Sequence, residues 1–316
     1  MTTNQKTVST ALVIIAYAIV YVVWGSTYFF IQMAINGFPP MMMGAVRFLI
    51  AGGLLLAWCA IKGDKLWVKK DIITSAVSGL LMLFVSMGIV IWAERSLPSA
   101  MVAIMVSTNP IWFVMLDRAN WNVNFKSKTT LSGLVLGFGG VFLLFGEAIN
   151  KSVNGKFSRA QLIGLLLLLF GPAAWAAGGL YSKRQGSNAP ARINTAWQMI
   201  FAGLVYIPAS FADNEFSTFN ISEVPMHAWL AIGYLIVFGS IIAFSAYVWL
   251  LSVRPATQVS THSYVNPVIA VLLGTLFARE IISSLQLLGL FVILFSVLLI
   301  NFTKYFSKSS LKIIGT

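Results

Sequence analysis

Residues 98–116 read PSAMVAIMVSTNPIWFVML, and residues 255–273 read PATQVSTHSYVNPVIAVLL. When the chain is shifted by 157 residues, Asn109-Pro110 coincides with Asn266-Pro267, and the two stretches begin with the same proline. Apolar identities arise easily in hydrophobic sequences. Polar and proline positions that recur at one offset instead indicate an internal duplication.

Two pairs of tryptophans extend this duplication beyond the quoted stretches. The same shift places Trp92 on Trp249. A slightly smaller shift relates Trp24 to Trp175, although the residues around this pair match only weakly. We therefore expect each half of the chain to form one copy of the same helical unit.

The composition identifies the class of protein. The chain has 316 residues, of which 58% are apolar and only 9% are charged. Soluble domains carry about 25% charged residues, so this composition excludes a soluble enzyme and a nucleic-acid-binding module. The net charge of +12 is then explained by basic loops beside a lipid bilayer, and no nucleic acid partner is expected. The single cysteine, Cys59, excludes an internal disulfide and a cysteine-based metal site.

Ten apolar runs are long enough to be membrane-spanning helices, which need about 20 residues each. They cover approximately residues 11–35, 40–61, 72–93, 99–116, 130–147, 160–181, 193–211, 227–251, 257–277 and 283–303. A membrane barrel would instead show short segments of alternating polarity. The sequence thus predicts an all-α polytopic membrane protein with ten transmembrane helices.

The basic residues predict the orientation of this arrangement. Of the 21 lysines and arginines, 15 lie on the side of the two termini, five lie on the other side, and Arg47 lies within a run. Because basic loops favour the cytoplasmic side, we expect both termini in the cytoplasm.

The two halves are expected to have opposite orientations, because each copy contains an odd number of helices. The sequence predicts two inverted-topology five-helix repeats, residues 1–148 and 149–316. This architecture is common in alternating-access transporters, in which a small-molecule substrate binds near the midplane between the halves.

Tryptophans near the middle of the runs are the first candidate site residues. Trp24 lies halfway along its run, and Tyr28 shares its helical face. Anchoring at the membrane interface does not explain a tryptophan at that depth, so we interpret it as lining a substrate pathway, together with Trp92, Trp175 and Trp249. The alternative is a packing stripe with interfacial aromatic residues.

The ninth run is the most polar of the ten and supplies the second group of candidates. It contains His262, Tyr264 and Asn266, and the fourth run contains Asn109 at the position equivalent to Asn266. Such groups are costly in lipid, so they must face protein or water, and we interpret them as substrate contacts. The alternative is that they hold neighbouring helices together by hydrogen bonds.

Two prolines and one histidine suggest how such a site works. Pro110 and Pro267 interrupt helical hydrogen bonding at equivalent positions, and we interpret them as hinges. His262 is the only histidine within a run and titrates near neutral pH when unperturbed, so protons are a candidate coupling ion.

Arg47 and Glu94 are charged residues in or beside the runs. We interpret them as a structural or gating pair, with Arg47 reaching either the membrane surface or Glu94. The sequence shows no cluster with metal-ligand spacing and no phosphate-binding glycine loop. We therefore expect no metal, no cofactor, no catalytic residue and no ATP-driven pump.

The motifs resemble those of a known family. The segments concerned are Trp24-Gly25-Ser26-Thr27-Tyr28-Phe29, Phe38-Pro39-Pro40, Arg47-Phe48, Ala93-Glu94, Leu97-Pro98-Ser99-Ala100, Phe238-Gly239-Ser240-Ile241-Ile242-Ala243, Tyr264-Val265-Asn266-Pro267-Val268 and Glu280. Their order and spacing are similar to those of the EamA family in the drug/metabolite transporter superfamily, and in particular to inner-membrane exporters of the YedA type. The resemblance covers essentially the whole chain. It implies ten helices in two inverted repeats and export of small metabolites such as amino acids, purines or amphipathic drugs.

These inferences together predict a secondary transporter of small metabolites, in the export direction, in a bacterial inner membrane. The alternatives are an importer or exchanger of the same fold, an integral-membrane enzyme, or a channel. The substrate-binding residues are expected to be Trp24, Tyr28, Trp92, Asn109, Trp175, Trp249, His262, Tyr264 and Asn266.

Overall fold

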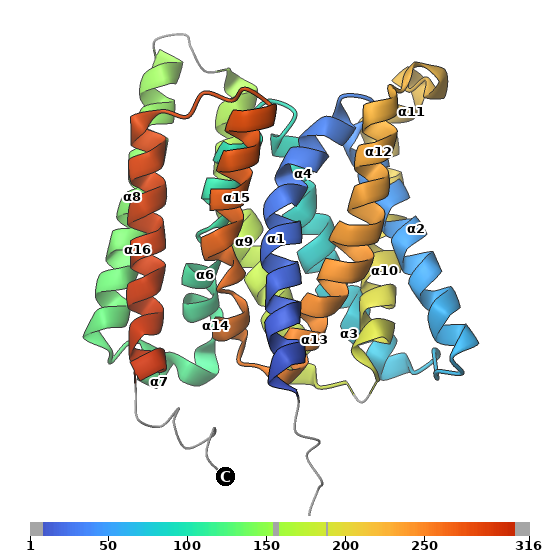
Figure 1. The fold of residues 1–316 in the computed structure, drawn as a ribbon, viewed down its shortest axis with the longest axis horizontal. Helices are drawn as coiled ribbons and strands as arrows, with labels where there is room; N and C mark the ends of the chain where they lie inside the picture. The colour runs from blue at the N-terminus through green and yellow to red at the C-terminus, as the bar shows by residue number, and fades with distance from the viewer. Residues whose placement is uncertain (1–8, 154–157, 188, 307–316) are drawn as a thin grey trace, which may run out of the picture.

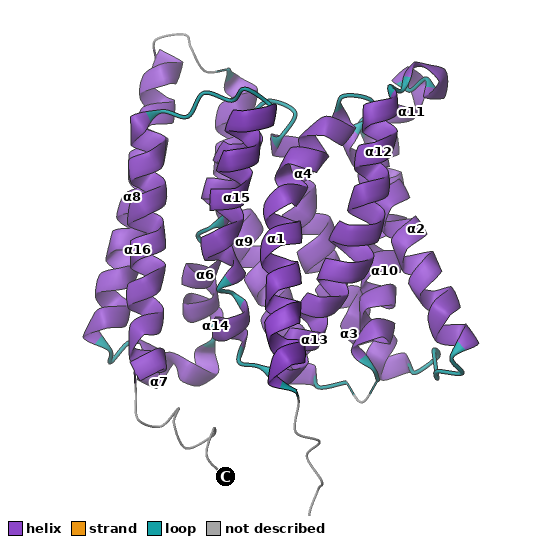
Figure 2. Cartoon of the chain, in the orientation of Figure 1, coloured by secondary structure: helices purple, strands orange, loops and turns teal. Residues whose placement is uncertain are grey.

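The computed structural model describes residues 9–153, 158–187 and 189–306, and within these ranges the chain forms helices and no strand (Figures 1 and 2). The elements up to residue 153 are α1 (Thr10–Ile35), α2 (Pro40–Ile61), α3 (Lys69–Gly79), η1 (Leu80–Ser86), α4 (Met87–Ala93), α5 (Ser99–Val106), α6 (Asn109–Leu116), η2 (Arg118–Asn120), α7 (Trp121–Asn124) and α8 (Lys128–Val153). The later elements are α9 (Arg159–Gln185), α10 (Ala191–Ala212), α11 (Glu215–Thr218), η3 (Ile221–Glu223), α12 (Met226–Tyr234), η4 (Leu235–Phe244), α13 (Ser245–Val253), α14 (Ala256–Val259), α15 (His262–Phe277) and α16 (Ser284–Phe306). The predicted all-helical class is confirmed for these residues.

Seven helical segments of the described chain are long and apolar enough to cross a membrane. They are Thr10–Ile35, Pro40–Ile61, Lys69–Ala93, Ser99–Leu116, Arg159–Gln185, Ala191–Ala212 and Met226–Val253. Three shorter apolar helical stretches are Lys128–Leu144, Val265–Phe277 and Ser284–Ser296. Each of the ten predicted runs thus coincides with helix, and seven meet the length and hydropathy that a membrane span requires.

The helices stand side by side, and elements from the two parts of the chain pack against each other. In Figure 1, α8 and α16 lie together at one flank and α2 lies at the other, and α2 packs on α10. Glycines allow the close approach of α8 and α16, because a Cβ added at Gly289 would lie 2.8 Å from Leu144. Small residues serve this purpose between membrane helices, where lipid is as apolar as the side chains.

Two segments of π-helix, η1 and η4, interrupt the third and eighth predicted runs. A π-helical turn changes the backbone hydrogen-bonding pattern, and such turns are frequent at functional sites. The hydroxyl of Tyr206 on α10 donates to the carbonyl of Leu83 in η1 at 2.9 Å. The indole Nε1 of Trp24 on α1 donates to the carbonyl of Gly239 in η4 at 3.1 Å. Each π segment is therefore held by an aromatic side chain from the other half of the chain.

Both runs that carry an Asn-Pro pair contain a helix break, but only in the fourth run does the break lie at the pair. There α5 ends at Val106 and α6 begins at Asn109, so that Pro110 occupies the first turn of α6. Proline fits this first turn because no backbone N–H is needed there. In the ninth run α14 ends at Val259 and α15 begins at His262, and Pro267 lies inside α15.

Two glutamates, Glu215 and Glu280, accept hydrogen bonds from backbone N–H groups at the starts of helices. Glu215 accepts hydrogen bonds from the backbone N–H groups of Met41 (2.9 Å) and Met42 (2.7 Å) at the start of α2. Glu280 accepts from the backbone N–H groups of Ser99 (2.9 Å) and Ala100 (3.0 Å) at the start of α5. Both carboxylates fill positions that a helix dipole favours.

Candidate functional site between the halves

Five aromatic rings from both halves meet in the centre of the bundle and are buried there. The ring centroid of Trp24 lies 5.3 Å from that of Trp175, 4.9 Å from that of Tyr247 and 5.1 Å from that of His262. Phe244 completes this group, which we call the aromatic cluster, at 6.3 Å from Trp24. Edge-to-face contacts of this kind are the arrangement that aromatic rings prefer.

Hydrogen bonds fix the orientation of the two tryptophans. Trp24 is held by the carbonyl of Gly239, and Trp175 donates from Nε1 to the hydroxyl of Tyr247 at 2.9 Å. Trp24 comes from α1, whereas Trp175 and Tyr247 come from α9 and α13. The cluster therefore joins helices that the repeat places in different halves.

His262 and Asn266 lie one helical turn apart on α15 and interact directly. The Asn266 amide group lies 3.2 Å from Nδ1 of His262. When the amide NH₂ points to the carbonyls of His262 (2.9 Å) and Tyr21 (3.2 Å), its oxygen accepts the proton on Nδ1. A neutral histidine then has Nε2 as an acceptor, and this atom is buried with no hydrogen-bond partner. The cluster thus contains one free acceptor beside the aromatic rings.

Asn109 lies at the start of α6, is only 2% exposed, and also has a buried side-chain oxygen with no hydrogen-bond partner. Unpaired buried polar atoms are uncommon in native proteins, and each calls for an explanation such as a ligand or a water molecule. His262 Nε2 and Asn109 Oδ1 are two such atoms in the regions where the sequence predicted substrate contacts.

The remaining predicted site residues are placed differently. Trp92 and Trp249 are partly buried, and among the described residues neither forms a ring pair with the aromatic cluster, although Trp249 packs against the core that contains it. The side chain of Tyr264 lies outside the described residues.

Sequence reasoning missed Phe244 and Tyr247, since neither interrupts the apolar pattern of its run. Their spacing of three residues, two and five positions before Trp249, was the available signal.

Arg47, Glu94 and Tyr28 form a second buried group, whose charges act on one another. Arg47 is 2% exposed and donates from Nε to the hydroxyl of Ser240 in η4 at 2.8 Å. Glu94 is 3% exposed, and neither carboxylate oxygen has a hydrogen-bond partner. The direct ion pair between Arg47 and Glu94 that the sequence suggested is not formed in this conformation, because the guanidinium is turned toward Ser240 and lies over the Phe48 ring.

A polar vestibule opens at the upper end of the molecule, on the side of α11 in Figure 1. It consists of two adjoining pockets of about 660 Å³ and 550 Å³, which share Gln32, Asn36, Glu94 and Arg95 in their walls. Arg95 is paired there with Asp213 at 2.9 Å. We call this space the upper vestibule, and Glu94 is its deepest acidic residue by exposure.

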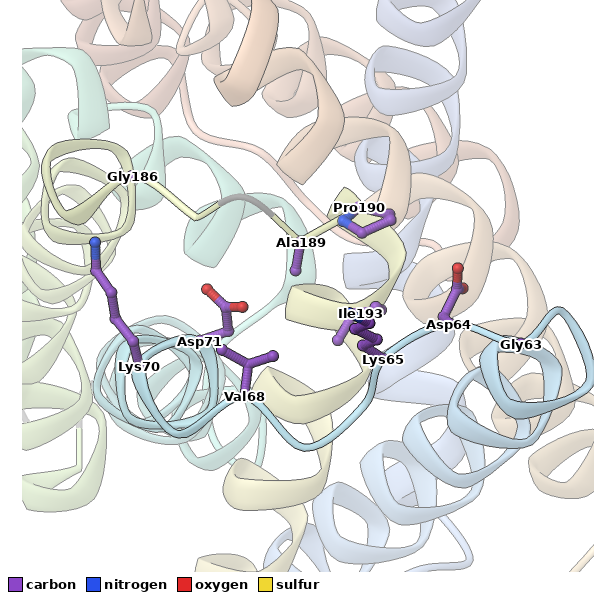
Figure 3. A pocket seen from close by; sticks show the side chains of 10 residues that line it. All are labelled: Gly63, Asp64, Lys65, Val68, Lys70, Asp71, Gly186, Ala189, Pro190 and Ile193. Atoms are coloured by element: carbon purple, nitrogen blue, oxygen red, sulfur yellow. The ribbon is translucent and has the colours of Figure 1, made fainter.

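A separate pocket of about 410 Å³ lies between the loop that precedes α3 and the loop that precedes α10 (Figure 3). Asp64 accepts hydrogen bonds from the guanidinium of Arg192 at 2.6 and 2.7 Å, and Asp71 accepts one from the hydroxyl of Ser187 at 2.7 Å. The bonds from Arg192 hold the pKa of Asp64 below its usual value. These contacts connect the loops of the two halves at the lower end.

Comparisons with known proteins identify the family of the chain. The sequence pattern of the EamA-like transporter family matches it twice, over residues 11–146 and 162–302. A crystal structure of a protein 16% identical in sequence matches with a TM-score of 0.64 and covers 92% of this chain and 98% of the other, which shows a shared fold.

Three curated relatives span nearly the whole chain. The "Uncharacterized inner membrane transporter YedA" of Escherichia coli (strain K12) is 38% identical and covers 90% of this chain and 89% of the relative. The "Uncharacterized transporter YvbV" of Bacillus subtilis (strain 168) is 25% identical over 90% of each chain. The "Probable amino-acid metabolite efflux pump" of Escherichia coli (strain K12) is 23% identical and covers 87% of this chain and 90% of the relative.

Proposed function

Because the chain belongs to the EamA-like transporter family, we propose that it is a secondary transporter that exports small metabolites by alternating access. The proposed arrangement has ten transmembrane helices in two inverted repeats, residues 1–148 and 149–316, with α8 extending to Val153 beyond the first boundary. The protein is placed in a bacterial inner membrane with both termini in the cytoplasm. Support comes from the two family matches, the inner membrane transporter among the relatives and the basic residues gathered on the side of the termini.

The observation that carries the proposal is the composition of the aromatic cluster. Helices of both halves build it, and His262 contributes a buried Nε2 acceptor that has no hydrogen-bond partner among the described residues. Aromatic faces with a few oriented polar atoms are typical of small-molecule sites. A solute that carries a hydrogen-bond donor and an apolar body would satisfy this acceptor and cover the rings.

Rocking of the halves would open this site first to one side and then to the other. The helix breaks before Asn109 and His262 provide points where such a movement requires little change in hydrogen bonding, with Pro110 and Pro267 as the proposed hinges. Export is favoured over import because one relative is named as an efflux pump.

The test is a counter-flow screen in proteoliposomes with amino acids, nucleobases and amphipathic amines. A substrate should enter vesicles preloaded with unlabelled compound, and its uptake should saturate. Trp24→Ala should weaken the apparent affinity roughly tenfold to hundredfold, which corresponds to a loss of about 1–3 kcal/mol. Trp58→Ala is the matched control, because Trp58 is 54% exposed on α2. Conductance without counter-flow would indicate a channel, and equal affinity in both variants would remove the aromatic cluster from the site.

A further inference from the structure

Glu94 is buried and has no hydrogen bond to its carboxylate, unlike Glu215, which is also buried, and Glu280, which is partly buried. Glu215 and Glu280 each accept three, including one from a serine hydroxyl and two from backbone N–H groups. Glu94 is as deeply buried as Glu215, with exposures of 3% and 4%, yet both of its oxygens are unpartnered. An ionised carboxylate in that state loses its hydration without replacement, at a cost of several kcal/mol.

Glu94 also has a path to water. It follows the last residue of the span Lys69–Ala93 and lines both pockets of the upper vestibule. Burial raises the pKa of the Glu94 carboxyl well above its usual value, the charge of Glu280 raises it further, and Arg47 opposes both effects. Burial therefore favours the neutral form of this carboxyl, which lies beside a space from which a proton can reach it.

Among the charged and titratable groups around Glu94, Arg47 is the buried cation that acts on it. Tyr28 on α1 is buried and neutral, and Glu280 is bound to the start of α5. Arg95 is engaged by Asp213, and His227 lies in the vestibule wall at the start of α12. Arg47 on α2 keeps Nη1 without a hydrogen-bond partner, so its guanidinium has unused capacity for a carboxylate.

We propose that Glu94 is a proton-binding site of the transport cycle, which is protonated while Arg47 is bonded to Ser240 and deprotonated when Arg47 pairs with it. This inference rests on the proposed alternating-access function. It identifies the proton as the ion coupled to transport and Glu94 as the residue that binds it. Ser240 belongs to the second half of the chain, whereas Arg47 and Glu94 both belong to the first. Movement of one half against the other breaks the Arg47–Ser240 bond and frees the guanidinium.

The proton balance of this exchange is simple. In the conformation seen here, one proton from the vestibule water is held on a Glu94 oxygen, and Arg47 is the only charge of the pair. In the other conformation the O–H bond of Glu94 breaks, one proton returns to water, and the carboxylate accepts N–H bonds from Arg47. Each exchange therefore couples one proton to one movement of the halves.

This assignment moves the coupling proton from His262 to Glu94. His262 uses Nδ1 in its contact with Asn266 and is enclosed by the rings of Trp24 and Tyr247. A positive charge on this imidazole would have no acidic partner among the described residues of the cluster. His262 is better suited to accept a hydrogen bond from substrate.

The experiment is infrared pH-difference spectroscopy of the full-length protein in liposomes, without any substrate. The parent should show the carbonyl band of a protonated carboxyl that titrates well above the usual glutamate value of about 4.3. Glu94→Gln should abolish the band, and the matched Glu215→Gln should retain it. A band that persists in Glu94→Gln, or its absence from the folded parent near neutral pH, would overturn the proposal.

A second variant keeps the test valid if Glu94→Gln does not fold. Ser240→Ala removes the partner that holds Arg47 away, so the proton affinity of Glu94 should fall at least tenfold, which is a shift of about one pH unit to lower pH. A sodium-dependent band shift at constant pH would assign the site to sodium and overturn the proton assignment. These infrared measurements need no substrate. A failed counter-flow screen would therefore contradict the transport proposal alone, and a failed titration would contradict the assignment of the proton to Glu94 alone.

Discussion

The fourth and ninth runs carry the same Asn-Pro pair, yet their helices break at different places. In the fourth run the break falls directly before Asn109, whose side-chain oxygen is unpaired. In the ninth run it falls at residues 260–261, and Asn266 lies inside α15, bonded to His262 and in reach of the Tyr21 carbonyl. The two equivalent segments of the repeat therefore adopt different backbone conformations within one molecule.

This asymmetry is what the proposed inverted repeats need if they are to alternate. If each half can adopt the conformation of the other, exchange of the two conformations reverses the side of the membrane to which the proposed site opens. The upper vestibule adjoins Glu94, whereas the loops at the lower end are tied by the Asp64–Arg192 ion pair.

The two π segments differ in how closely atoms of the chain pack around their glycines. Substitution of these glycines by alanine should therefore change the free energy of unfolding by different amounts. A Cβ at Gly79, directly before η1, would overlap the carbonyl oxygen of Gln198 and lie 2.6 Å from its Cα. Backbone atoms cannot move aside, so Gly79→Ala should lower the free energy of unfolding by about 3 kcal/mol, at the upper end of overpacking effects. The measurement is thermal unfolding in detergent.

Gly239→Ala in η4 is the comparison. Its Cβ would meet the end of the Arg47 side chain at 3.1 Å and a methyl group of Thr27 at 3.2 Å, both of which can shift slightly. We expect a loss of about 1 kcal/mol. Gly53→Ala, with no atom within 4 Å, is the control and should cost less than either. Equal losses at Gly79 and Gly239 would mean that the two π segments are packed alike.

Asparagine substitutions test the asymmetry of the two breaks. Asn266→Ala should lower the free energy of unfolding by about 2 kcal/mol, because His262 Nδ1 and nearby carbonyls lose their partner inside the protein. Asn109→Ala removes an oxygen that bonds to nothing and should stay within about 0.5 kcal/mol of the parent. Chemical denaturation of both variants in the same detergent compares them. A larger loss at Asn109 would show that the break in the fourth run is the more tightly held.

The helical class and the duplication were predictable, because hydrophobic length indicates membrane helices and repeated polar positions indicate an internal repeat. All ten predicted runs coincide with helix, and the family pattern occurs twice in the chain. The π segments were not predictable, since Leu80–Ser86 and Leu235–Phe244 have the composition of ordinary apolar helix. Their geometry depends on side chains from the other half, which no local pattern reveals.

The candidate site was predictable only in part for the same reason. Trp24, Trp175 and His262 were identified by their depth and polarity, and they do meet. Phe244 and Tyr247 look like any apolar residue of a span, so only the packing assigns them. The absent Arg47–Glu94 pair shows that charge alone does not choose a partner, because Ser240 is brought to the guanidinium by the opposite half.

The smallest expected effect concerns the hydrogen bonds that each half sends to the π segment of the other. Tyr206→Phe removes only the donor to Leu83, and its ring continues to pack on Phe48, with ring centroids 5.8 Å apart. The carbonyl loses one neutral hydrogen bond, so the expected loss is about 1 kcal/mol. Trp24→Phe removes the donor to Gly239 and leaves a smaller ring, so it should cost slightly more. Tyr181→Phe is the matched control, because the Tyr181 side chain is partly exposed and its hydroxyl has no hydrogen-bond partner among the described residues, so it should be close to neutral in the same thermal unfolding measurement. If Tyr206→Phe is as stable as this control while Trp24→Phe is not, then only η4 is stabilised by a hydrogen bond from the opposite half. The two halves would then differ in the stabilisation of their π segments as well as in the position of their helix breaks.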